Sequence, residues 1–398
     1  MTGRERVARA MRHQIPDRVP VFCQLSLGHY FLHAGLPAHE VWFTSEGFAE
    51  ALVRLQRRYR FDGLLVNLPG RPVDLLSRVR RIERSDEGER LFWDDGGMTV
   101  IPQDDNPHHY LSESGAPLPR ASFDELDPSG LERFHECPGF TWHVYHVPHV
   151  DGLTGGCILT EAPDSFLRTV QAVKARVGHE VSVHGEVFSP FTQFMELFGY
   201  QEALMGLVTD GGKARAMLDR LTESAIIWAV AQARAGVDAV LVSSAFAGAG
   251  FISRTMYAEF VAPFERRLNE AVRAAGVPVY THTCGRIGDR LDLMAQTAGD
   301  GLDTLDPPPL GDVRLADAKR TIGRQLFIKG NMNSVALLAC RTAEEVRAEG
   351  LGCLEAGKPG GGYILSTACS VAPRVEPWKL ELLAPLAEEL GRYDSGGT

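Results

Sequence analysis

From residue 181 onward the chain alternates short apolar runs with amphipathic stretches, and this alternation limits the fold more than any other feature. Each run has the length of a strand, and most are rich in β-branched residues and bounded by Gly, Pro, Asp or Asn. The stretches between them have helical spacing, most clearly at Gly212–Ala235 and Tyr257–Ala275. Six βα units therefore follow one another. Their predicted strands are Val181–Glu186, Ala239–Ser244, Val277–His282, Gly301–Asp306, Leu326–Gly330 and Gly362–Ser366.

Two further strand-like runs, Val19–Cys23 and Gly63–Asn67, precede this series. A helical stretch at Thr44–Tyr59 separates them, so they extend the same alternation toward the N-terminus. Eight strands that alternate with helices predict an α/β fold of the (β/α)₈ TIM-barrel type, with N-terminal helices, rather than an open doubly wound sheet.

The spacing between the second and third predicted strands is longer than the others and predicts an insert at about residues 70–180. Within it, Leu91–Ile101 is typical of a β-hairpin that turns at Asp95–Gly97, and the remainder is typical of loops that cover one face of the barrel. A last helix is expected at Glu376–Leu390. We expect residues 1–398 to form a single barrel domain around this insert.

Composition excludes several classes of function. The net charge is −10, so the protein has no basic field for nucleic acid or for an anionic membrane surface. The most apolar long window, Ala225–Ser244, contains Arg234 and Asp238 and is too polar to span a bilayer. The N-terminal residues lack the apolar core of a signal peptide, and we expect a cytoplasmic protein. Seven cysteines without export signals argue against a disulfide framework, and most are expected to fill the core.

Two of the cysteines stand beside a histidine at the predicted strand ends. His282 and Cys284 are two residues apart on an extended segment, so both side chains project to the same side. Cys369 follows the eighth predicted strand, and the carboxyl ends of barrel strands meet at one face. Two sulfurs and one nitrogen with a free fourth position are the ligands of a catalytic zinc site. The alternative, a rim histidine with two core cysteines, stays open at this point.

Other polar residues at the strand ends are candidates for binding and catalysis. Glu186 is a candidate fourth ligand or general base, and pairing with a barrel arginine is its alternative. Asp306 is a candidate acid or base, and capping of the next segment is its alternative. Gln24, Asn67 and Asn331 are candidate substrate-binding residues on position alone.

Several segments together resemble the uroporphyrinogen decarboxylase superfamily along nearly the whole chain. The resemblance implies a (β/α)₈ barrel, in agreement with the strand count. The segments that carry it are Arg4–Met11 with Asp17–Val21, Ala235–Ala239, His282–Gly285, Gly330-Asn331 and Gly360–Leu365.

The superfamily holds two chemistries, and the motifs of this chain favour one of them. The decarboxylases carry an arginine-rich segment after the first strand, an aspartate after the second and a histidine after the last. This chain has Cys23-Gln-Leu-Ser-Leu-Gly-His29, Val66-Asn-Leu-Pro69 and Ser366-Thr-Ala-Cys369 at those places. A tetra-anionic porphyrinogen would be poorly held without the arginines.

The resemblance therefore points to the zinc-dependent methyltransferases of the corrinoid and coenzyme M type, whose His-x-Cys and distant Cys match His282, Cys284 and Cys369 one for one. It implies transfer of a methyl group between a small methoxy or thiol compound and a corrinoid (cobalamin). No corrinoid-binding Asp-x-His-x-x-Gly segment occurs in the chain, so a partner protein would carry the corrinoid. Two alternatives stay open: a metal-free decarboxylase of the uroporphyrinogen decarboxylase type, and a non-enzymatic barrel that binds a tetrapyrrole or corrinoid. The oligomeric state is open too, a homodimer included.

Overall fold

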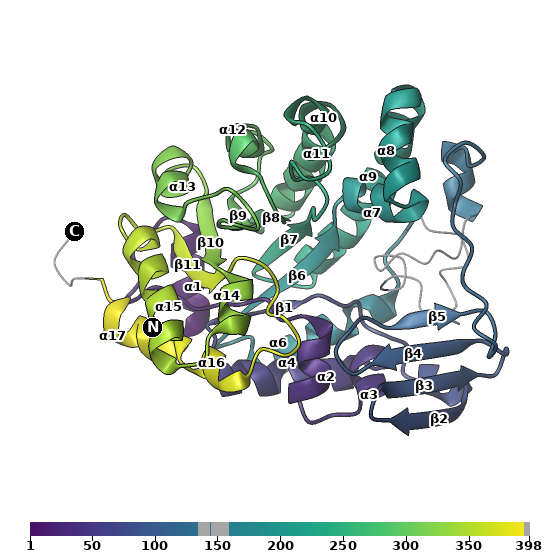
Figure 1. The fold of residues 1–398 in the computed structure, drawn as a ribbon, viewed down its shortest axis with the longest axis horizontal. Coiled ribbons are helices and arrows are strands. Elements are labelled where there is room, and N and C mark those ends of the chain that lie inside the picture. Colours follow the sequence, from purple (N-terminus) through teal and green to yellow (C-terminus); the bar gives the residue numbers. More distant parts are fainter. Residues whose placement is uncertain (134–143, 145–158, 394–398) are drawn as a thin grey trace.

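A curled, parallel seven-stranded sheet forms the centre of the molecule, and helices surround it (Figure 1). The computed structural model describes residues 1–133, 144 and 159–393. The strands follow the order β1-β6-β7-β8-β9-β10-β11, and each neighbouring pair is parallel. Their bounds are β1 Gly63–Val66, β6 Ser182–Phe188, β7 Ala239–Ser243, β8 Val279–Thr283, β9 Gly301–Thr304, β10 Phe327–Met332 and β11 Tyr363–Thr367.

Seven of the eight predicted strands are therefore present, and the first is not a regular strand. The segment Val19–Cys23 makes a single bridge, from Val21 to Leu365 of β11. It is nevertheless hydrogen bonded on two sides, because Phe22 N donates to Leu365 O (2.9 Å) and Asp62 N donates to Val21 O (2.7 Å). Pro20 has no N–H to donate, which interrupts the ladder within the segment. The segment thus lies between β11 and the start of β1 without forming a full strand.

A buried carboxylate ties this segment to β1. Asp62 Oδ2 accepts from Val21 N (2.8 Å) and from Arg18 Nη1 (2.7 Å). Its Oδ1 accepts from Arg6 Nη1 (2.6 Å). Asp62 and both arginines are buried, so the ion pairs are shielded from solvent.

Replacing Asp62 by alanine is expected to destabilise the protein by about 3–5 kcal/mol, because Arg18 would stay buried without its carboxylate. Urea unfolding of the metal-free protein measures this change. Asp86→Ala, at an exposed turn, is the matched control and should change the free energy of unfolding by less than about 0.5 kcal/mol. Equal stabilities of the two variants would contradict this role of Asp62.

The helices predicted at Thr44–Tyr59 and Gly212–Ala235 are present as α4 (Ser45–Tyr59) and α9 (Gly211–Arg234). Short 3₁₀-helices lie at η1 Leu75–Arg78, η2 Pro128–Arg133, η3 Asp164–Leu167 and η4 Gly288–Arg290. The α-helices are α1 Gly3–Met11, α2 Leu27–His33, α3 Ala38–Phe43, α4 Ser45–Tyr59, α6 Arg168–Val177, α7 Pro190–Phe198, α8 Tyr200–Thr209, α9 Gly211–Arg234, α10 Arg254–Phe260, α11 Ala262–Ala274, α12 Leu291–Met294, α13 Leu315–Thr321, α14 Ser334–Ala339, α15 Ala343–Gly357, α16 Pro377–Glu381 and α17 Leu383–Leu390.

Two predicted helices are each divided in the structure. The helix expected at Tyr257–Ala275 is broken at Val261 into α10 and α11, because Pro263 cannot donate to the carbonyl four residues earlier. The helix expected at Glu376–Leu390 is likewise divided into α16 and α17, with Pro385 in the first turn of the second. The prediction of continuous helices was wrong at both places.

The region between β1 and β6 carries a second, antiparallel sheet of four strands, at the lower right of Figure 1. Its strands are β2 Val79–Ser85, β3 Gly88–Trp93, β4 Met98–Pro102 and β5 His108–Tyr110. β3 and β4 form the predicted hairpin, and Gly97 N donates to Asp95 Oδ1 (2.8 Å) in its turn. β2 and β5 extend it, so this region has more sheet than predicted. The predicted loops at 134–143 and 145–158, with Cys137 and Cys157, lie outside the described residues.

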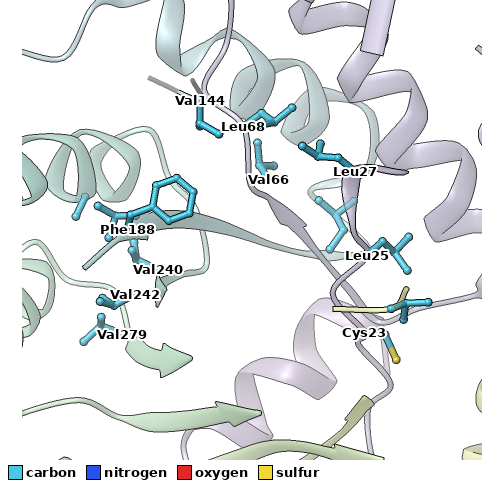
Figure 2. Packing of buried hydrophobic residues seen from close by; sticks show 14 of the residues in the cluster. Cys23, Leu25, Leu27, Val66, Leu68, Val144, Phe188, Val240, Val242 and Val279 are labelled. Carbon is cyan, nitrogen blue, oxygen red and sulfur yellow. The ribbon is translucent and has the colours of Figure 1, made fainter. Parts of the chain in front are cut away.

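The two ends of the central sheet differ. At the amino ends of the strands, Val7, Ala10 and Met11 of α1 pack in one cluster with Tyr280 of β8 and Phe327 of β10. A larger apolar cluster fills the space between the strands and the helices, part of which Figure 2 shows. The carboxyl ends are left to polar residues and a cavity. No helix among the described residues is long and apolar enough to cross a membrane.

Candidate metal centre

Three side chains that are far apart in the sequence meet at the carboxyl ends of the strands. His282 lies on β8, Cys284 follows the end of β8, and Cys369 follows the end of β11. The Sγ atoms of Cys284 and Cys369 are 3.7 Å apart, and His282 Nε2 lies 3.4 Å and 4.0 Å from them. Within residues 1–133, 144 and 159–393, no other group of three His, Cys, Asp or Glu is arranged to hold a metal ion.

The spacing of these three atoms fits a tetrahedral zinc ion. Zn–S bonds of about 2.3 Å and a Zn–N bond of about 2.0–2.1 Å imply a sulfur–sulfur edge of about 3.8 Å and nitrogen–sulfur edges of about 3.5–3.6 Å. The observed edges are 3.7 Å, 3.4 Å and 4.0 Å. Three protein ligands leave a fourth position for a substrate atom, as in catalytic rather than structural zinc sites.

The imidazole of His282 is held by two neighbours on β9. Its Nδ1 lies 2.9 Å from Asp303 Oδ2 and 2.8 Å from Thr304 Oγ1. Nδ1 donates its proton to the carboxylate, so Nε2 is the ring nitrogen that faces the two sulfurs. Histidine ligands of zinc are commonly fixed in this way by a carboxylate behind the ring.

Asp303 in turn pairs with Lys329 of β10, whose Nζ lies 3.0 Å from Asp303 Oδ1. The three residues are register partners on adjacent strands, His282 opposite Asp303 and Asp303 opposite Lys329. Both charged side chains are only 2% exposed. Asp303 and Lys329 were not predicted from the sequence. Their position as charged residues inside two predicted strands would have indicated them, because buried charged residues are rare unless they are paired.

The three candidate ligands perturb one another's protonation. A hydrogen bond with Cys284, only partly opposed by burial, holds the pKa of Cys369 well below its usual value. The same hydrogen bond, reinforced by burial, raises the pKa of Cys284. Burial lowers the pKa of His282, but hydrogen bonds to Asp303 and Cys369 outweigh it and raise that pKa to about 10. The site therefore contains a thiolate and two protons that a bound metal would displace.

Asp306 supports the turn that carries Cys284. Its Oδ2 accepts from Gly285 N (2.7 Å), and Gly285 has a φ of 78°, which a side chain would disfavour. The side chain of Asp306 is not among the residues that line the cavity beside the metal ligands. Its predicted role as an acid or base stays a prediction, and its observed contact is with the backbone.

A cavity of about 250 Å³ opens beside the candidate ligands. His282, Cys284 and Cys369 line it together with other residues proposed from the sequence: Glu186, Gln24 and Asn67. Gln24 Oε1 and Asn67 Oδ1 are buried and have no hydrogen-bond partner in the structure described here. These atoms are therefore available to a bound molecule.

Glu186 lines the cavity and has a pKa suited to a catalytic acid. It lies on β6 and is 8% exposed. Burial raises the pKa of Glu186 to about 7, opposed by the charge of His282 and a hydrogen bond with Ser243. A carboxyl group with this pKa can hold or release a proton near neutral pH.

Asn331 is not brought to the cavity. Its Nδ2 donates to Leu305 O (2.9 Å) and lies 3.4 Å from Val313 O, so it fastens the loop after β9. In its place the cavity receives Asn106, from the connection between β4 and β5, and Phe246, which follows β7. Neither residue was predicted from the sequence. The approach of Asn106 depends on how the antiparallel sheet lies against the barrel face.

Comparison with known proteins identifies the family to which the chain belongs. The family described as uroporphyrinogen decarboxylase (URO-D) matches residues 135–390, more than half of the 398 residues. The chain belongs to the uroporphyrinogen decarboxylase family. The matched region contains Glu186 and all three candidate ligands, whereas Gln24 precedes it.

Relatives in this family carry two kinds of activity in their names. Methylcobamide:CoM methyltransferase MtbA of Methanosarcina mazei is 24% identical over 246 residues, 62% of this chain and 69% of that protein. A uroporphyrinogen decarboxylase of Syntrophotalea carbinolica is 27% identical over 232 residues, 56% of this chain and 64% of that protein. This second match therefore spans less than two thirds of the relative's length.

Among solved structures, a methyltransferase from Methanosarcina mazei has the same fold as this uroporphyrinogen decarboxylase family member. The TM-score is 0.69, with 98% of this chain and 99% of that chain covered at 18% identity. A sequence identity of 18% supports a shared fold but not a shared reaction. The evidence on the reaction therefore comes from the residues of the site.

Proposed function

We propose that this protein is a zinc-dependent methyltransferase that moves a methyl group between a small methylated substrate and a corrinoid held by a partner protein. The observation that carries the proposal is the trio His282, Cys284 and Cys369, whose ligand atoms lie within 4.8 Å of one another. Its open side faces a cavity of about 250 Å³. The methyltransferases among the relatives support the same reaction.

A zinc ion bound by these three residues would supply Lewis acidity to the oxygen or sulfur that carries or accepts the methyl group. Asp303 holds the ring of His282 through Nδ1, so that Nε2 faces the two sulfurs and can bind the metal once its proton is displaced. Gln24 and Asn67 offer amide groups that can orient a substrate in the cavity. Asp306 acts as a positioning residue through Gly285.

Glu186 supplies the proton that the transfer requires. When the bond between the methyl carbon and its oxygen or sulfur breaks, the electron pair stays on that heteroatom, which then takes up a proton. Glu186 lines the cavity with His282 and is buried, so its carboxyl group is protonated over much of the range below neutral pH. We assign it as the general acid in demethylation and the general base in the reverse direction.

Demethylation is expected to slow as the pH rises through about 7, where Glu186 loses its proton. The raised pKa fixes the sign, because only the protonated form, present below it, can donate. Glu186→Gln should lower kcat by about 10²–10⁴-fold and remove this limb of the pH–rate profile. Steady-state rates from pH 5.5 to 9 provide the measurement. If the rate of Glu186→Gln still fell as the pH rose through about 7, the titrating group would be a residue other than Glu186.

The decarboxylases among the relatives make a carboxy-lyase the second candidate. It requires cationic side chains for the substrate carboxylates, and the described lining of the cavity contains no arginine or lysine. Elemental analysis of the purified protein separates the two reactions. One zinc per chain together with methyl transfer supports the first proposal, whereas metal-free protein that releases CO₂ from uroporphyrinogen would overturn it.

We infer that Val19–Cys23 takes the eighth position of a closed (β/α)₈ barrel and that residues 1–398 form one domain. The hydrogen bonds from this segment to Leu365 and Asp62 support the inference.

A further inference from the structure

Apart from the candidate ligand His282, the cavity beside the metal ligands has no basic side chain among the described residues that line it. Seventeen residues line it, and among these described residues there is no lysine or arginine. The undescribed segments 134–143, 145–158 and 394–398 contain no lysine or arginine either, so they cannot supply one. Substrates that carry a sulfonate, carboxylate or phosphate need such a partner when they are buried.

Apart from the metal ligands, the charged side chains of the lining are acidic. Glu196 is a carboxylate, and Glu186, whose pKa is raised to about 7 by burial, becomes one above neutral pH. Two thiolates would cancel the charge of a divalent ion at the centre. An anionic substrate would therefore enter a site with no net attraction for it, and close approach of like charges is unfavourable. The electrostatics of the lining act against anions.

The rest of the lining is uncharged: it consists of apolar side chains, neutral amides and the hydroxyl groups of Ser26, Thr192, Ser243 and Ser370. Leu25, Leu27 and Phe188 belong to the packed cluster in Figure 2 and also line the cavity. Phe246 continues this wall outward, because its ring stacks against those of Tyr200 and Phe251 at centroid distances of 5.1 Å and 5.3 Å. The wall thus runs from the metal ligands to two partly exposed aromatic rings.

Three carboxamides face the same space from separate parts of the chain. They are Gln24 after the bridged segment, Asn67 after β1, and Asn106 from the connection between β4 and β5. Carboxamides can hydrogen bond to hydroxyl, ether or amine groups without adding charge. A volume of about 250 Å³ lies below the ~300–1,000 Å³ of most ligand pockets and suits a molecule with a single ring.

We propose that the methyl-carrying substrate of this site is an uncharged methyl ether or methyl thioether with an apolar body of about one ring, and that anionic thiols and acids are rejected. This inference rests on the proposed methyltransferase function and adds the substrate class. Apolar contact comes from Leu25, Phe188 and Phe246, and polar contact comes from the three carboxamides.

Matched pairs of ligands test the charge preference directly. Titration calorimetry on zinc-loaded and metal-free protein would compare 2-methoxyphenol with 2-methoxybenzoate, and 2-(methylthio)phenol with 2-(methylthio)benzoate. We expect the neutral member of each pair to bind about tenfold or more tightly than the anion. Equal or tighter binding of the anions, or no binding of either neutral compound, would overturn the proposal.

A single added charge should reverse the preference. Asn106→Arg places a cation in the cavity wall, and we expect the ratio of neutral to anionic affinity to fall by about tenfold. Gln103→Arg adds the same charge to an exposed position of the same connection and should leave the ratio unchanged. The same shift in both variants would overturn a role for the lining. Because binding is also measured on metal-free protein, absence of zinc or of methyl transfer would contradict the proposed function without deciding the charge preference.

Discussion

Replacing Cys284 by serine is expected to remove zinc binding and methyl transfer together. A serine hydroxyl at neutral pH does not replace a thiolate as a zinc ligand, and His282 and Cys369 alone would leave a two-ligand site. Loss of a partner behind a ligand already weakens zinc binding by about 10–100-fold, so loss of the ligand itself should exceed about 100-fold. Zinc should fall from one per chain to near zero by elemental mass spectrometry, and turnover should fall below detection.

A matched thiol controls for general effects of losing a cysteine. Cys340 is partly buried and does not line the cavity, so Cys340→Ser should keep its zinc and its rate. Cys369→Ser should repeat the loss seen at Cys284, because its Sγ lies 3.7 Å from that of Cys284. Full activity in a zinc-free Cys284→Ser protein would contradict the assignment of a catalytic metal.

The sequence predicted the strands well because each is a short apolar run, and most of these runs are rich in β-branched residues and separated by helical stretches. Seven runs became β1 and β6–β11, and the parallel order followed from the alternation with helices. The run at Val19–Cys23 did not form a strand, since Pro20 leaves its ladder incomplete. The broken helices have the same origin, because Pro263 and Pro385 each remove one donor that periodicity does not register.

The candidate ligands were predictable for a different reason. His282, Cys284 and Cys369 follow strands whose carboxyl ends share one face, so position alone brought them together. Position did not distinguish Glu186, which lines the cavity, from Asn331, which binds backbone carbonyls instead. Both residues lie within their strands, so the difference depends on the direction in which each side chain projects from the strand.

The carboxylate of Asp303 reaches His282 through the pairing register of β8 and β9, which the sequence of one strand alone does not show. Asp303 reaches the imidazole because it pairs opposite His282 on one side and opposite Lys329 on the other. Asn106 reaches the cavity only through the second sheet. Residues positioned by pairing between distant segments were therefore missed, whereas residues positioned by their own strand were found.

Asp303→Asn is expected to weaken zinc binding and to destabilise the fold, and the two effects can be separated. The carboxylate orients His282 at 2.9 Å, so its loss should lower zinc affinity by about 10–100-fold. It also leaves Lys329 buried without a counter-charge, which should cost about 3–5 kcal/mol of folding stability. Competition with a chelator measures the affinity, and urea unfolding of the metal-free protein measures the stability.

The double variant Asp303→Asn with Lys329→Met isolates the metal effect. Methionine has a similar length and no charge, so the buried cation is removed and most of the lost stability should return. Zinc affinity should stay low, because the imidazole Nδ1 still lacks its carboxylate. Recovery of zinc affinity along with stability would mean that Asp303 acts on the centre only by balancing Lys329. Persistent loss of affinity in a stable protein would assign Asp303 the orienting role behind the metal ligand.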